Sequence, residues 1–205
     1  MANIRIKSQW FHDGASKTPQ QQASAMAFIT WRVAQNTLKQ MRSARFDIEV
    51  GAQYFAFTHE VLVFLTQVID RLAAQRMDDA MRTEFMTALV QRVAQVLQDN
   101  EEGLMGEPGA GQGSYADQFI DLYNQLADHY ADFGFDAHGP DFAFVRYLGH
   151  RIEALMPDKD KRWVVDQVMA SEVPDALGMI GRGMDGVLST EPHAKRGARG
   201  AVSGD

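Results

Sequence analysis

The stretch VGAQYFAFTHEVLVFLTQVIDRLAA, residues 50–74, decides the fold of this 205-residue chain. It contains no proline, and its apolar side chains recur every three or four residues, the spacing that places them on one face of an α-helix. These side chains are Tyr54, Phe57, Val61, Leu65, Val68 and Leu72. An apolar face of this length needs a sizeable core to cover it. The stretch therefore predicts the central helix of an all-α domain.

Five further helices are predicted on either side of this one, over residues 19–41, 78–100, 114–133, 141–156 and 158–188. Thr18 precedes Pro19, and Ser114 stands three residues before Asp117, so both are candidate N-caps. Pro174 lacks a backbone N–H and is expected to kink or restart the last helix. The expected fold is a single compact bundle of about six helices.

The chain divides into three parts by composition. Residues 1–19 read as an irregular N-terminal arm, residues 20–188 as the helical domain, and residues 189–205 as a disordered tail. Within the domain, residues 101–113 (EEGLMGEPGAGQG) carry five glycines and a proline, which is typical of a loop. We expect this loop to separate two three-helix halves.

Composition excludes several classes of protein. The absence of cysteine excludes disulfides, thiol catalysis and cysteine metal sites. No window approaches the roughly 20 uninterrupted apolar residues of a membrane span, and the first residues do not form a signal peptide. We expect a cytoplasmic protein with no membrane partner and no cofactor.

The net charge of −7 is unevenly distributed. Residues 1–46 carry seven Lys or Arg and one Asp, a balance of +6, whereas residues 101–188 carry six basic and sixteen acidic residues, a balance of −10. We therefore expect the two ends to attract each other, within one chain or across a homodimer. Trp10 and Phe11 would anchor the basic arm, and the acidic target would be the stripe formed by Asp117, Asp121, Asp128 and Asp132.

The pair His59-Glu60 is the most catalytic-looking feature of the central helix. Zinc proteases place a second histidine four residues after the first, so that both imidazoles reach one metal, but Val63 occupies that position here. On a helical wheel, Glu60 lies opposite the apolar face and His59 lies on the flank of the polar side. Both are therefore predicted to be at least partly exposed to solvent. The sequence predicts neither a metal site nor a catalytic residue.

Four residues are the candidate ligand-binding positions: Arg151, His150, Asn36 and His59. Arg151 falls inside an apolar arc, where a charge must be paired or must reach water. Its expected partner is a carboxylate from another helix, and the alternative is an anionic ligand. Asn36 falls between two apolar stripes, where a buried amide needs hydrogen-bond partners.

Three functions follow from these features. The leading hypothesis is a non-enzymatic protein that binds another protein or forms a homodimer. The first alternative is a small-molecule or metal site inside the bundle, near Arg151 and His150 or near His59. The second is nucleic-acid binding through the basic residues of 1–46, which the acidic total charge disfavours.

Overall fold

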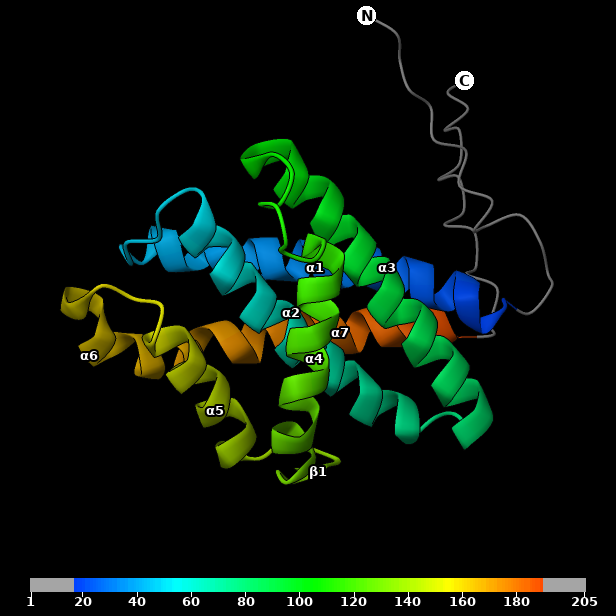
Figure 1. Ribbon diagram of the computed structural model, residues 1–205. Helices are drawn as coiled ribbons and strands as arrows, with labels where there is room; N and C mark the ends of the chain where they lie inside the picture. The colour runs from blue at the N-terminus through cyan, green and yellow to red at the C-terminus, as the bar shows by residue number, and fades with distance from the viewer. Residues whose placement is uncertain (1–16, 190–205) are drawn as a thin grey trace, which may run out of the picture.

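The computed structural model describes residues 17–189, which form an all-α bundle (Figure 1). Its helices are α1 (Pro19–Ser43), α2 (Ala52–Ala74), α3 (Asp79–Met105), α4 (Tyr115–Ala131), α5 (Phe142–Glu153), α6 (Asp158–Gln167) and α7 (Val173–Leu188). A π-helical turn, Val168–Glu172, joins α6 to α7 without a break. The described part of the chain thus has six continuous helical segments, which confirms the predicted fold class.

Side-chain caps define where several helices begin. The Thr18 hydroxyl accepts a hydrogen bond from the backbone N–H of Gln21, and the Gln21 side chain accepts one from the N–H of Thr18. Ser114 accepts a hydrogen bond from the N–H of Asp117 at 3.0 Å. These contacts satisfy backbone donors that have no partner within the first helical turn. Both predicted N-caps are therefore confirmed.

Helix α2 is the centre of the molecule. It packs against α1, α3, α4, α5 and α7, and it runs through the middle of the ribbon in Figure 1. Its side chains are buried on more than one face, because neighbouring helices cover it on several sides. Of the predicted apolar face, Phe57, Val61, Leu65 and Val68 are buried, whereas Tyr54 and Leu72 are only partly buried. On the neighbouring helices, Leu89, Leu126 and Leu148 are buried and Leu122 is partly buried.

The π-turn keeps the last two helices facing the core. The N–H of Val173 donates to the carbonyl of Val168, five residues back, so the turn holds one more residue than an α-helical turn. As a result, Glu172 and Val173 are both buried although they are adjacent in sequence. The π-turn ends just before Pro174, which has no backbone N–H to donate to the hydrogen bonds of the helix.

Helix α7 then lies close to α1. A Cβ atom at Gly183 would come within 3.0 Å of the Ile29 side chain, which is tighter than ordinary van der Waals contact. Glycine at this position therefore allows the close approach of the two helices.

Two local features differ from those expected: the end of α3, and a short hairpin between α4 and α5. Helix α3 continues to Met105, so the loop begins at Gly106, where φ is +82°, and not at residue 101. The first residues of the expected loop stay helical because Glu101 is buried against α2, a tertiary contact that local composition does not reveal. A two-residue hairpin, β1 (Phe135–Asp136) with β2 (Gly139–Pro140), connects α4 to α5.

The arm residues Trp10 and Phe11, and almost all of the predicted tail, lie outside the described residues. Within residues 17–189, no helix combines the length and the hydropathy that a membrane crossing needs.

Leu65→Ala tests the central position of α2. Leu65 is completely buried, so its truncation removes apolar contacts and leaves a cavity. We expect the free energy of unfolding to fall by roughly 2–5 kcal/mol, measured by urea denaturation. A near-neutral result would contradict the placement of this side chain in the core.

Candidate functional site

A charged contact joins α2 to α5. Arg151 donates from Nε to Glu60 Oε2 at 3.0 Å and from a terminal nitrogen to Glu60 Oε1, so the guanidinium and the carboxylate meet in a two-pronged pair. The hydrogen bonds to Glu60 raise the pKa of Arg151 above its usual value. The prediction that a carboxylate from another helix pairs with Arg151 is confirmed.

The prediction that Glu60 faces solvent is wrong. Glu60 is 5% exposed, because helices cover the polar side of α2 as well as its apolar side. The helical wheel correctly separated Glu60 from the apolar face, but it carried no information about which face meets water. His59 is also mostly enclosed: 13% of its side chain is exposed, and its Nε2 lies 2.9 Å from Glu101 Oε2 on α3.

Two tyrosines, Tyr130 and Tyr147, lie close enough to the Glu60–Arg151 pair to be affected by its charges. Tyr130 is fully buried, and its ring lies 4.8 Å from that of Phe144 and 5.1 Å from that of Tyr147, measured between centroids. Burial, and then the nearby Glu60 carboxylate, raises the pKa of Tyr130 well above its usual value. The Tyr130 hydroxyl is thus held neutral near the ion pair, and the burial of Glu60 strengthens the attraction between the two charges.

The four candidate ligand-binding residues are dispersed. His150 is exposed and lies between Arg146, which donates to its Nε2 at 3.1 Å, and Glu153, whose carboxylate is 3.0 Å from its Nδ1. Asn36 is partly buried on α1, and no hydrogen bond found within residues 17–189 involves its side chain. None of the four lines either of the two cavities described below. A ligand site at these residues stays a prediction.

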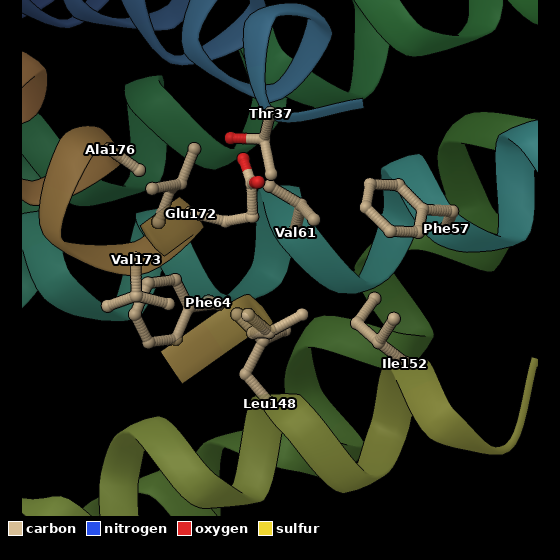
Figure 2. A pocket seen from close by; sticks show the side chains of 11 residues that line it. Thr37, Phe57, Val61, Phe64, Leu148, Ile152, Glu172, Val173 and Ala176 are labelled. Atoms are coloured by element: carbon tan, nitrogen blue, oxygen red, sulfur yellow. The ribbon is translucent and has the colours of Figure 1, made fainter. Parts of the chain in front are cut away.

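An enclosed cavity lies between α1, α2, α5 and the π-turn (Figure 2). The space open to the centre of a water molecule is about 10 Å³, close to the room that one water requires. Its lining is apolar except for Thr37 and Glu172. In Figure 2 the Glu172 carboxyl group points toward Thr37, while apolar side chains from α2 and α5 form the opposite wall.

Glu172 is the buried carboxyl group that the sequence analysis missed. It is 2% exposed, it accepts a hydrogen bond from Gln167 at 2.9 Å, and its Oε2 atom has no hydrogen-bond partner. Burial raises the pKa of Glu172, and the negative charge of Asp175 adds to the effect. The signal was present in the sequence, since Glu172 continues the four-residue steps of the buried Val164 and Val168.

A second, open cavity forms a groove between the C-terminal half of α1 and the start of α2. We call it the α1–α2 groove, and it is lined by Gln35, Leu38, Lys39, Arg42, Ser43 and Tyr54, with a volume of about 580 Å³. Arg42 donates to the carbonyl of Ile48 at 2.7 and 3.1 Å, and its guanidinium lies 5.6 Å from the Tyr54 ring centroid. The Arg42 side chain is thereby fixed in position, whereas Lys39 is exposed.

The acidic stripe lies on the outer face of α4. Asp117, Asp121, Asp128 and Asp132 are all exposed, as the amphipathic pattern predicts, while Phe119, Leu126 and Tyr130 on the other face are buried. Residues 114–141 contain six aspartates and no Lys or Arg. Conversely, residues 18–46 contain four Lys or Arg and no carboxylate.

The charged ends do not pair directly within the described chain. None of the ion pairs found in residues 17–189 joins an arginine or lysine of residues 18–46 to an acidic residue of 101–188. Helix α1 does contact the second half through α7, but that contact is largely apolar. Direct attraction of the basic and acidic ends within one chain therefore stays a prediction for the part outside residues 17–189.

Glu60 and His59 are each paired with a group on another helix. Glu60 is paired with Arg151 and His59 with Glu101, and neither lines one of the two cavities. Within residues 17–189, no three histidine or acidic side chains gather as a metal site would require. No family model, curated protein or solved structure matches this chain.

Arg151→Met tests the buried ion pair. The substitution keeps an unbranched side chain but leaves Glu60 buried without a counter-charge. We expect a loss of about 3 kcal/mol in the free energy of unfolding, the low end of the range for a broken buried pair, because 35% of the Arg151 side chain is exposed. Urea denaturation measures the loss.

Arg146→Met is the matched control, because Arg146 lies on the same helix but is exposed. Its effect should stay within about 0.5 kcal/mol. Replacing Glu60 by methionine as well should recover part of the Arg151→Met loss, since it removes the unpaired charge. Equal losses at Arg146 and Arg151 would contradict a specific role for the pair.

Proposed function

We propose that this chain is a non-enzymatic binding protein that forms a homodimer, with the acidic face of α4 in one copy against the α1–α2 groove of the other. The observation that supports this proposal is the separation of charge on the surface. Four Lys or Arg and no carboxylate occupy residues 18–46, whereas six aspartates and no Lys or Arg occupy residues 114–141.

The α1–α2 groove has the composition of a binding surface. It combines the cations Lys39 and Arg42 with the ring of Tyr54 and the apolar Leu38. Tyrosine and arginine are enriched among the residues that dominate binding energy at protein interfaces. The Tyr54 hydroxyl donates to Gln35 Oε1, and Gln35 Nε2 is a buried donor without a partner. The groove thus offers positive charge and an aromatic ring to an acidic partner.

The acidic face of α4 is the occupant that the charges favour. Its aspartates are exposed and take part in none of the ion pairs found in residues 17–189. Helix α4 packs chiefly on α3 and α2, and this packing leaves its outer face available to a second copy. In a two-fold dimer the same contact would occur twice, which doubles the contribution of each residue pair.

Charge pairs alone supply modest affinity. Exposed ion pairs contribute about 0–1 kcal/mol each, so they mainly select the partner and its register. Apolar contacts at the rim of the groove would add to them. Val50, one turn before Tyr54, is 71% exposed, and the sulfur of the exposed Met105 lies close to the backbone of Gly51.

Light scattering tests the dimer. The monomer mass is 22.9 kDa, and we expect about twice that value at high micromolar concentration. Lys39→Glu should weaken the dimer about tenfold at low salt, because it replaces two attractive contacts per dimer with repulsive ones. The effect should shrink at high salt. Arg42 is left intact in this design because it holds the Ile48 carbonyl.

Two further variants make the test specific. Arg32→Glu is the control, since Arg32 is an exposed cation of α1 that does not line the groove. It should leave the dimer affinity nearly unchanged. Asp121→Lys combined with Lys39→Glu should restore association, because the charges at the contact are then exchanged. A monomeric mass at every concentration, or equal effects at Lys39 and Arg32, would refute the proposed contact.

The N-terminal arm supplies a separate prediction. Trp10 and Phe11 offer an apolar anchor beside the basic residues of the arm. Deletion of residues 1–14 should lower the melting temperature or weaken the dimer, and Trp10→Ala should reproduce most of that loss. If the shortened protein melts and associates as the full chain does, the arm is free to bind an external acidic partner instead. A cytoplasmic location also stays a prediction.

A further inference from the structure

We propose that Glu172 is a proton-binding site in the core: its neutral acid form holds α7 against α1, and loss of the proton loosens this contact at the π-turn. The proposal concerns a group that the dimer contact does not use. It rests on the cavity, on the hydrogen-bond directions around the carboxyl group, and on the local helix geometry.

The Oε2 atom of Glu172 has no hydrogen-bond partner, and Thr37 is the other polar side chain that lines the cavity. Thr37 donates its hydroxyl proton to the carbonyl of Val33 at 3.2 Å, so its oxygen presents lone pairs to other neighbours. Figure 2 shows the Glu172 carboxyl group directed toward this oxygen. An ionised carboxylate would place two acceptors opposite each other, whereas the neutral acid has an O–H to donate.

The elements packed around Glu172 bring no positive charge to it. Helix α1 presents Thr37, and the neighbouring Gln40 donates to Asp175 while its own Oε1 atom is buried without a partner. Asp175 is the charged group that acts on Glu172, and its negative charge disfavours ionisation. The walls supplied by α2 and α5 are apolar: Phe57, Val61, Phe64 and Leu65 from α2, and Leu148 and Ile152 from α5.

The helix opens first at the π-turn when Glu172 loses its proton. An ionised carboxylate needs several hydrogen-bond donors, but the cavity has room for only about one water molecule. Further water can reach Glu172 only if the surrounding helices move apart. Between Val168 and Val173 a π-helical turn replaces the regular α-helical hydrogen bonds, and Pro174 has no N–H to donate. We therefore expect this segment to be the easiest part of the α6–α7 helix to open. Opening here would separate the start of α7 from α1.

The direction of the pH effect follows from linkage. Burial raises the pKa of Glu172 in the folded state above its value in the unfolded chain. The folded state therefore binds this proton more tightly than the unfolded state does. The stability that the proton contributes is fully present below the unfolded pKa, and it is lost as the pH rises through the folded pKa.

Glu172→Gln in the full-length chain tests the proposal, because glutamine keeps the shape and the donor of the neutral acid but has no proton to lose. We expect the variant to melt close to the wild type near about pH 5 and above it near about pH 9. Hydrogen exchange of the amides in residues 168–176, corrected for intrinsic rates, should lose protection with rising pH in the wild type and keep it in the variant.

Asp175→Asn is the control, because it removes a neighbouring exposed carboxylate and leaves Glu172 able to ionise. It should retain the pH-dependent loss of protection. NMR titration of the Glu172 carboxyl carbon in the wild type does not depend on the folding of any variant. Its midpoint should lie above that of glutamate in an unfolded peptide. A midpoint at or below the unfolded value, or a Glu172→Gln variant less stable by the same amount at every pH, would overturn the proposal.

Discussion

The enclosure of α2 is the constraint on which the rest of the structure depends. Once five helices pack against one, most of its polar side is shielded from water, and buried polar groups on it are stabilised by partners in the protein. Thr58 and Thr66 donate to carbonyls one turn earlier on α2 itself. Glu60 takes Arg151 from α5, and His59 takes Glu101 from α3. These pairs also specify which helices stand beside α2, since removal of one partner leaves a costly buried group.

Among the described residues, three glutamate carboxyl groups are buried, and they differ in the partner that compensates their burial. Glu60 meets a guanidinium, and Glu101 meets an imidazole, so each is matched by a basic group. Glu172 accepts one hydrogen bond from the Gln167 amide and forms no ion pair within residues 17–189, so its burial favours the neutral acid. Because the π-turn brings Glu172 inward together with Val173, the irregular helix geometry and the unusual carboxyl group belong to one feature.

The surface explains why binding is a better proposal than catalysis. Glu60 and Glu101 in the interior are paired with basic groups, whereas the exposed cations of α1 and the exposed aspartates of α4 lie on separate elements. In the proposed dimer, such a distribution would increase the rate of encounter between copies and orient them, and apolar side chains near the groove would supply contact area. The proton-linked site lies on the buried side of the same α1 turns whose outer side forms the groove.

Local sequence patterns were sufficient for the helices, their caps and most of the core, because these depend on side chains within a few residues of each other. The need of Arg151 for a carboxylate was predictable for the same reason, since a charge inside an apolar arc requires a partner. The identity of that partner was not predictable: Glu60 is 91 residues away, and a helical wheel shows which residues share a face without showing what covers the face. The extension of α3 past residue 101, the approach of α7 to α1 at Gly183, and the cavity beside Glu172 were likewise decided by packing between helices, because each depends on atoms that come together only in the folded chain.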